Sequence, residues 1–135
     1  MYAIKTEVSD AKARSWTFDA QKTMYGGKHA KPGDLIFVFA SENEGGVGLV
    51  ACGTVSQVEA APLRPDIERQ TPRISIVIDR IGPAKRRLGR VELKTFNDWN
   101  DRRPETELNF KLYRQATDKI VGLSPEATEF LRGFF

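Results

Sequence analysis

The chain has 135 residues, of which 40% are hydrophobic and 29% charged, a composition typical of soluble globular proteins. This length suffices for one hydrophobic core, so we expect a single domain spanning residues 1–135. No apolar run is long enough to span a membrane, and the N-terminus lacks a secretory signal pattern. A single cysteine, Cys52, excludes an intramolecular disulfide and favours a reducing compartment. We therefore expect a cytoplasmic monomer with no membrane partner.

Positive charge is concentrated in one segment of the sequence. The chain carries 21 Lys and Arg against 18 Asp and Glu, a balance that is compatible with a polyanionic partner but does not require one. Residues 80–90, RIGPAKRRLGR, hold five basic residues and no acid. They could form a solvated hairpin tip that resists edge aggregation or a loop that contacts phosphates. The candidates for contact with a nucleic-acid backbone are Lys85, Arg86, Arg87 and Arg90.

In the N-terminal third, residues 2–8 predict a first strand. Ser9 and Asp10 are possible helix caps, and a second helical turn could begin at Thr17. The Gly-rich stretch MYGGKHAKPGD, residues 24–34, predicts a loop.

Strands follow in the middle of the chain. The continuous apolar run LIFVFA, residues 35–40, predicts a strand covered on both faces. Residues 47–60 alternate in hydrophobicity, and the glycines Gly48 and Gly53 within them indicate a bend or bulge. After the Pro-punctuated loop at 61–72, residues 73–81 alternate again, and RVELKTF predicts a further strand.

Helical signals return near the C-terminus. Thr95 could cap a short turn, and Pro104 could begin a helix over residues 104–115. DKIVGL predicts a closing strand, and the sequence from Ser124 to Glu126 is a strong helix start. The sum predicts an α+β fold: a small bent β-barrel of five to six mostly antiparallel strands, with short helices after strand 1 and at the C-terminus.

The sequence shows no cofactor or metal site. The lone histidine and cysteine, His29 and Cys52, do not have the spacing of zinc ligands. Cys52 on an alternating strand is typical of a small core residue. GGVGL precedes a strand rather than a helix, which is the wrong context for a dinucleotide site.

Several segments resemble a known family. KPGDLIFVFAS followed by GGVGLVACGTVSQVEAAP is similar to the barrel signature of the EVE family, within the PUA-like superfamily that also includes ASCH and YTH domains. NFKLYRQATDKIVGLSPEATEFL resembles the C-terminal end of EVE-like domains. The match covers residues 2–8, 31–62 and 107–131. SWTFDAQKTMYGGKHA lacks the GVRN motif of better-known members, which places the chain in a divergent, bacterial-type branch.

The resemblance implies a PUA-like barrel with a pocket for an extruded, often modified, base of DNA or RNA. Such a pocket needs aromatic faces for stacking and polar groups that read the base edge. The candidate pocket residues are Trp16, Tyr25, Ala40, Ser41, Trp99, Arg114, Gln115 and Thr117. Any single one of these aromatics is slightly more often a plain core residue, and Ser41 could equally be a turn residue. Without the resemblance, the 114–117 segment would favour a helix end.

We therefore predict a non-enzymatic nucleic-acid-binding module that recognises a modified or flipped base. The alternative is a small amidohydrolase of the ASCH type acting on a modified nucleoside, with Lys22, Thr23 and either Glu59 or Glu92 as its reactive groups. A third possibility is a protein-interaction or small-ligand domain that uses the same pocket.

Overall fold

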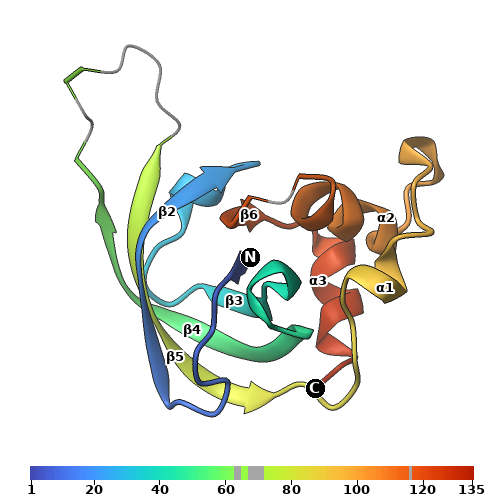
Figure 1. The fold of residues 1–135 in the computed structure, drawn as a ribbon, viewed down its shortest axis with the longest axis horizontal. Helices are drawn as coiled ribbons and strands as arrows, with labels where there is room; N and C mark the ends of the chain where they lie inside the picture. The colour runs from blue at the N-terminus through green and yellow to red at the C-terminus, as the bar shows by residue number, and fades with distance from the viewer. Residues whose placement is uncertain (63–64, 67–71, 116) are drawn as a thin grey trace.

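Six strands of the described residues close into a barrel in the order β1-β3-β4-β5-β2-β6 (Figure 1). The computed structural model describes residues 1–62, 65–66, 72–115 and 117–135. The strands are β1 (Tyr2–Thr6), β2 (Ser15–Met24), β3 (Leu35–Ala40), β4 (Gly48–Ala60), β5 (Arg73–Pro83) and β6 (Lys119–Gly122). Most neighbouring strands run antiparallel, whereas β1 with β3 and β2 with β6 are parallel. The predicted fold class is confirmed.

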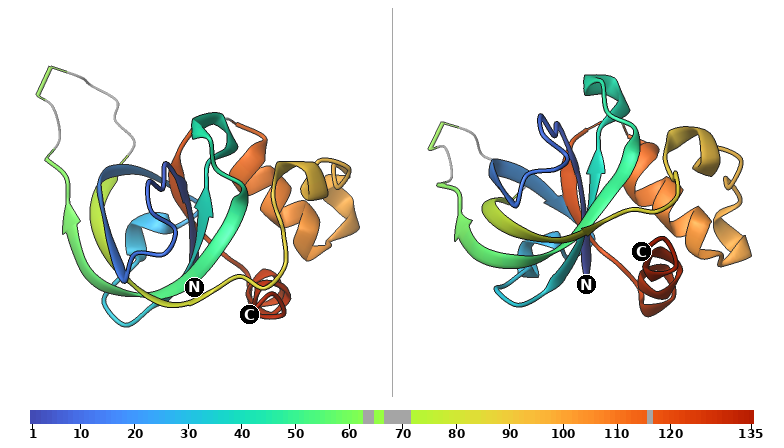
Figure 2. Two further views of the ribbon diagram at one scale, coloured as in Figure 1. Left: turned by 60° about the horizontal axis from the view of Figure 1, so that its bottom comes forward. Right: turned by 90° about the horizontal axis from the view of Figure 1, so that it is seen from below.

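Helices cover one side of the barrel, as the views in Figures 1 and 2 show. The α-helices are α1 (Arg90–Leu93), α2 (Pro104–Leu108) and α3 (Pro125–Arg132). Short 3₁₀ turns are η1 (Gly27–His29), η2 (Glu42–Glu44) and η3 (Trp99–Asp101), and a π-helical turn, η4 (Asn109–Tyr113), extends α2. Among the described residues, each helix falls short of the length and apolarity that crossing a membrane requires.

The alternation of side chains along β3 creates two hydrophobic cores. Ile36 and Val38 pack with residues of the other strands in one cluster. Phe37 and Phe39 join the second cluster, which contains residues of α2, η4 and α3. Because successive side chains of a strand point to opposite faces, a strand buried on both faces must be apolar throughout. The prediction for residues 35–40 is thus confirmed.

The bend predicted for the 47–60 strand is also present. The pairing register of β4 with β5 shifts between Cys52 and Gly53. A Cβ atom at Gly53 would lie 2.6 Å from the carbonyl oxygen of Asp79, so the bulge needs glycine there. Gly48 has a φ of +88°, a conformation that glycine adopts without strain.

Local predictions in two segments are wrong. The helix with Ser9 or Asp10 as its cap and the helical turn from Thr17 are both absent from the described residues, because β2 is the next element after β1 and its Trp16 and Phe18 alternate into the core opposite Ile78 and Ile76. RVELKTF begins as helix α1 instead of a strand, with Leu93 buried in the core beside the helices.

Of the predicted helix starts, Thr95 is wrong, whereas Ser124 and Pro104 are confirmed. Asp98, not Thr95, caps the turn at Trp99, and its carboxylate accepts from the Asn100 N–H. Ser124 caps α3 as predicted, and Pro104 begins α2. Within the predicted loop 61–72, residues 63–64 and 67–71 lie outside the described residues.

Candidate functional site

The segment after α2 widens into the π-helical turn η4. The N–H of Arg114 donates to the carbonyl of Asn109, five residues earlier, at 3.0 Å. Leu112 is fully buried and anchors the turn in the core, while Phe110 is only partly buried and Arg114 is exposed. Single π-helical turns inside α-helices occur frequently at functional sites, because the extra residue re-aims the side chains around it.

A hollow of about 430 Å³ opens between this turn and α1, and it is lined by Arg90, Lys94, Asn97, Asn109, Phe110, Tyr113 and Arg114. We call it the cationic hollow, because its lining holds three basic side chains and no carboxylate. The guanidinium of Arg114 lies over the ring of Phe110, 4.9 Å from its centroid. This arrangement combines an aromatic surface with positive charge.

Glu42, in the 3₁₀ turn η2, positions two groups of the cationic hollow. Its carboxylate accepts from the hydroxyl of Tyr113 at 3.0 Å and from the backbone N–H of Arg90 at 2.6 Å. The guanidinium of Arg90 also donates to the side chain of Asn43 at 2.5 Å. Burial, followed by the negative charge of Glu42, raises the pKa of Tyr113 well above its usual range. Tyr113 therefore stays a neutral hydrogen-bonding group.

A second, much smaller hollow of about 20 Å³ lies between Tyr25 and the residues that follow η4. Arg114, Gln115 and Lys119 contribute to its lining. The volume is enough for about one water molecule. The half-exposed ring of Tyr25 packs against Lys111, whose Nζ lies 5.3 Å from the ring centroid.

Two buried lysines lie side by side beneath this region. Lys5 on β1 and Lys119 on β6 are paired across the sheet, and each is only 1% exposed. Lys119 Nζ donates to the Gln115 carbonyl at 3.1 Å, and Lys5 Nζ lies 5.1 Å from the ring centroid of Tyr113. Burial, with the neighbouring charge of Lys5, lowers the pKa of Lys119 to about 8, and burial also lowers that of Lys5. Strongly shifted pKa values cluster at functional sites.

Ser41 lies at the same end of β1 and is 1% exposed. Its backbone N–H donates to the carbonyl of Thr6, the residue after Lys5, at 2.8 Å. Its hydroxyl is buried with no hydrogen-bond partner among the described residues. Ala40, just before it, is also buried. A buried hydroxyl without a protein partner is uncommon.

Acidic residues lie close to the two lysines. The pKa of Glu44 is raised to about 7, chiefly by a hydrogen bond to Asp118, with burial and the charges of Asp118 and Glu7 adding to it. The carboxylate of Asp118 partly offsets the lowering of the Lys119 pKa. The polar end of β1 and β6 therefore holds mixed charge, unlike the cationic hollow.

The three predicted stacking aromatics do not share one cavity. Trp16 is 7% exposed, stacks on Phe18 with ring centroids 6.4 Å apart, and donates from Nε1 to the Asp10 carbonyl at 2.8 Å. Tyr25 lines the small hollow. Trp99 is 57% exposed, and its ring centroid lies 4.8 Å from that of Phe110. Tyr25 and Trp99 thus flank the turn η4, whereas Trp16 belongs to the barrel core.

The predicted backbone-contacting residues are divided between two places. Arg90 lines the cationic hollow. Arg86 lies near the C-terminus, where it donates to the Gly133 carbonyl at 2.8 Å and lies over the ring of Phe134. Arg87 is 3.9 Å from Glu92, and Lys85 is exposed. Of the polar 114–117 segment, Arg114 and Gln115 reach the hollows, and Thr117 is exposed outside them.

The residues considered for an amidohydrolase are dispersed. Thr23 is buried on β2, and its hydroxyl donates to the carbonyl of Pro72 at 2.6 Å. Glu59 is exposed on β4, while Glu92 lies on α1. Lys22 is near enough to Lys119 to lower its pKa. Among the described residues, no group of three or more His, Cys, Asp or Glu is arranged to hold a metal ion.

Sequence reasoning missed several residues around η4. Lys94, Phe110 and Tyr113 line the cationic hollow, and Lys5 and Lys119 form the buried pair. A lysine next to an isoleucine in each of two predicted apolar strands, as in YAIKT and DKIVG, is the signal that could have identified the buried pair.

The closed barrel with its short helices is a PUA-like fold, and the comparisons with known proteins agree. No protein-family model matches the sequence, and no curated protein matches it. The DUF55 (EVE-type) domain of human thymocyte nuclear protein 1 superimposes with a TM-score of 0.66 at 15% identity, covering 98% of this chain and 96% of that one. The predicted EVE-like fold is therefore confirmed.

Two further solved structures share the fold. Human THYN1 protein in complex with DNA containing 5-methylcytosine superimposes with a TM-score of 0.66 at 17% identity, covering 98% of this chain and 95% of that one. A hypothetical protein from Leishmania major gives 0.58 at 15% identity, with 98% and 92% covered. At these identities the likeness shows the fold alone.

Proposed function

We propose that this protein is a non-enzymatic nucleic-acid-binding module that holds a modified or flipped base at the turn η4 (Asn109–Tyr113). The observation that carries the proposal is the cationic hollow. It places the aromatic rings of Phe110 and Tyr113 among the basic side chains of Arg90, Lys94 and Arg114. An unstacked base needs an aromatic or guanidinium plane to replace its lost neighbours, and its phosphate needs nearby positive charge.

The remaining candidate residues fit supporting roles. Arg114 presents a planar guanidinium that can stack on a base or bind its phosphate. Gln115 carries both a donor and acceptors for the base edge, and Tyr25 lines the same small hollow. The unpartnered hydroxyl of Ser41 and the ammonium of Lys119 supply further hydrogen-bonding groups behind this rim.

The comparisons support the same proposal. A protein with this fold, human THYN1, has been captured with DNA containing 5-methylcytosine. The added methyl group of a modified base is apolar, so it gains from contact with an aromatic wall such as Phe110. DNA and RNA oligonucleotides are both candidate partners.

Binding to fluorescently labelled oligonucleotides tests the proposal. Single-stranded and duplex DNA, and single-stranded RNA, would carry either cytosine or 5-methylcytosine and be titrated at two salt concentrations. We expect salt-dependent binding, tighter with 5-methylcytosine in at least one of the three. Replacing Arg114 by Ala should weaken it roughly tenfold, since one charge-assisted contact is lost. Lys31→Ala, an exposed lysine outside the cationic hollow, is the matched control.

Two results would overturn the proposal. The first is no salt-dependent binding to any of the three nucleic acids. The second is equal weakening by Arg114→Ala and Lys31→Ala, because binding would then follow overall charge and not the cationic hollow.

A further inference from the structure

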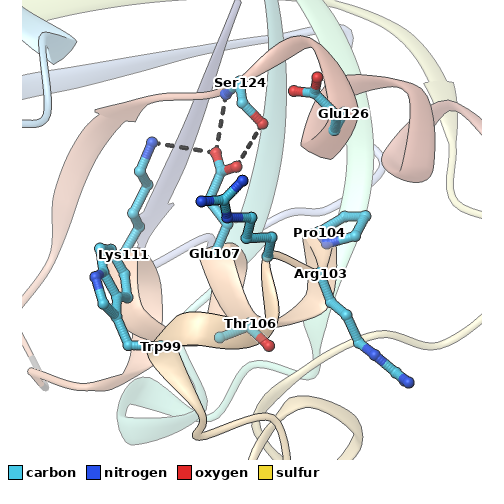
Figure 3. Close-up of a pocket in the computed structure, with 9 residues that line it drawn as sticks. Trp99, Arg103, Pro104, Thr106, Glu107, Lys111, Ser124 and Glu126 are labelled. Atoms are coloured by element: carbon cyan, nitrogen blue, oxygen red, sulfur yellow. Dashed lines mark hydrogen bonds and ion pairs between the residues drawn. The ribbon is translucent and has the colours of Figure 1, made fainter.

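A larger hollow lies on the other side of η4, beside α2 and the start of α3. Its volume is about 570 Å³, and its lining includes Trp99, Arg102, Arg103, Lys111 and Glu126. Figure 3 shows Trp99 and Lys111 on one side, Glu107 and Ser124 at the back, and Glu126 on the opposite side. We call it the Trp99 hollow. It is large enough for a nucleotide.

Hydrogen bonds hold the loop that presents Trp99. The carboxylate of Asp98 accepts from the Asn100 N–H at 3.1 Å. Asp101 accepts from the Arg103 N–H at 2.9 Å and from the Thr106 hydroxyl at 2.9 Å. These bonds fix the loop on α2, so the exposed indole of Trp99 is a surface already in place before a ligand arrives. Preorganisation of this kind lowers the entropic cost of binding.

The free charge of the Trp99 hollow is positive. Glu107 is already satisfied, because it accepts from the backbone N–H and hydroxyl of Ser124 and from Lys111 Nζ. Among the described residues, neither Arg102 nor Arg103 forms an ion pair, and both are exposed. Their guanidinium groups are therefore available to a phosphate.

Glu126, in the first turn of α3, adds a carboxylate at the far side of the hollow. A carboxylate accepts hydrogen bonds from the exocyclic amino group of a base such as cytosine. The Trp99 hollow therefore offers an aromatic surface, free guanidinium groups and one acceptor, which together match the parts of a nucleotide.

The two hollows share one aromatic pair. Phe110 lines the cationic hollow, and Trp99, which lines the other, packs on Phe110 with ring centroids 4.8 Å apart. A nucleic-acid strand whose base is held in the cationic hollow therefore has a second stacking surface directly beside it. Resting on the proposed function, we propose that the Trp99 hollow binds the nucleotide next to the recognised base, stacking that nucleotide on Trp99 and pairing its phosphate with Arg102 and Arg103.

The test compares the affinity of a single nucleotide with that of a short strand. The probes are 5-methyl-2′-deoxycytidine monophosphate and a trinucleotide that carries the same nucleotide between two thymidines. Both are titrated by NMR, following the indole N–H signals of the two tryptophans. Trp16 is buried and serves as the internal reference. We expect the trinucleotide to shift the Trp99 signal and to bind more tightly than the mononucleotide.

The variants are Trp99→Ala, Trp99→Phe and the double change Arg102→Ala with Arg103→Ala. We expect Trp99→Ala to remove most of the affinity gained on lengthening the probe, roughly five- to 150-fold for one stacked base. Trp99→Phe, which keeps an aromatic face, should restore part of that gain. The arginine double variant should lose part of the gain and show a weaker salt dependence. Unchanged urea midpoints confirm that each variant is folded.

The outcomes separate this inference from the proposed function. If the wild-type protein binds neither probe nor longer oligonucleotides, the proposed function fails. If binding occurs but Trp99→Ala lowers the affinity for both probes equally, Trp99 contributes to the cationic hollow and the inference is wrong. If Trp99→Ala changes neither affinity, the second nucleotide lies elsewhere and the inference is equally wrong.

Discussion

The paired lysines Lys5 and Lys119 are costly side chains to bury. Each is 1% exposed, and burial is the main cause of the lowered pKa of both. A fold that keeps such groups gives up stability for them, a pattern that is common where side chains serve binding or catalysis. Lys119 is held by the Gln115 carbonyl, so its amine reaches the rim of the candidate site.

Replacing Lys119 by Met should therefore stabilise the protein at neutral pH. The pKa of Lys119 falls from 10.5 to about 8 on folding, so at lower pH the fold must hold a buried charge. This difference corresponds to at most about 3 kcal/mol. The lost hydrogen bond to Gln115 offsets part of it, so we expect a net gain of about 1–2 kcal/mol in the free energy of unfolding.

The pH dependence gives the decisive measurement for this variant. Between pH 8 and 10.5 the unfolded chain binds the Lys119 proton and the folded chain does not, so wild-type stability rises with pH across this range. Urea unfolding at pH 7 and pH 10 should show the advantage of Lys119→Met shrinking at the higher pH. An advantage of equal size at both pH values would mean that packing, not charge, is its cause. Lys31→Met, at an exposed position, is the control.

Among the strands, the fully buried β3 and the alternating β4 and β5 were predictable, whereas β2 was not. Residues 35–40 are apolar throughout because both faces of β3 are covered. β2 presents Asp19, Gln21 and Lys22 beside its buried Trp16 and Phe18, so its polar face obscured the alternation. The α1 segment was misassigned because four helical residues are too few to show a 3.6-residue period.

The candidate site was predictable in part, from the cluster of basic residues that includes Arg90 and from the family resemblance. Arg114 and Gln115 matched the EVE-like C-terminal pattern, and both reach the hollows around η4. The π-helical turn itself leaves no signature in composition, yet it places Phe110 and Tyr113 on the cationic hollow. The pairing of Lys5 with Lys119 joins the first and last strands of the barrel, a contact that sequence separation conceals.

The junction of α2 with α3 gives a prediction at the scale of elements. Ser124 accepts from the Ala127 N–H at 3.1 Å as the cap of α3, and its hydroxyl also donates to Glu107 on α2. Ser124→Ala removes both contacts. We expect a loss of about 1–2 kcal/mol in the free energy of unfolding, measured in urea at pH 7. Ser9→Ala, at an exposed position, should change it little.

The same change should show a characteristic pH dependence. Burial alone would raise the pKa of Glu107, but hydrogen bonds from Ser124 and Lys111 hold it below its usual value. A lowered carboxyl pKa contributes stability above its unfolded value, near 4.5, that is lost as the pH falls further. The cost of Ser124→Ala should therefore be larger at pH 7 than at pH 3. An equal loss of unfolding free energy at both pH values would mean that Ser124 acts only as the helix cap and not through Glu107.

For the whole molecule, the distribution of charge matters more than its sum. The net charge of +3 is too small to predict strong nonspecific binding. The barrel and helices nevertheless gather Arg90, Lys94 and Arg114 into one hollow, while Lys85, Arg86 and Arg87 lie on the turn that leads from β5 to α1. These two groups carry equal charge, so they form matched sets for deciding which surface meets a phosphate backbone.

The salt dependence of oligonucleotide binding distinguishes the two sets. For single strands, the slope of log affinity against log salt falls by about 0.7 for each phosphate contact removed. Replacing the three basic residues of the cationic hollow by Ala should therefore reduce the magnitude of the slope by about 2. The triple variant of the 85–87 turn should keep the wild-type slope, because Arg86 is engaged with the Gly133 carbonyl and Arg87 faces Glu92. If the slope falls in the turn variant and stays unchanged in the hollow variant, the turn and not the cationic hollow contacts the phosphate backbone. The comparison is direct because both variants remove three positive charges.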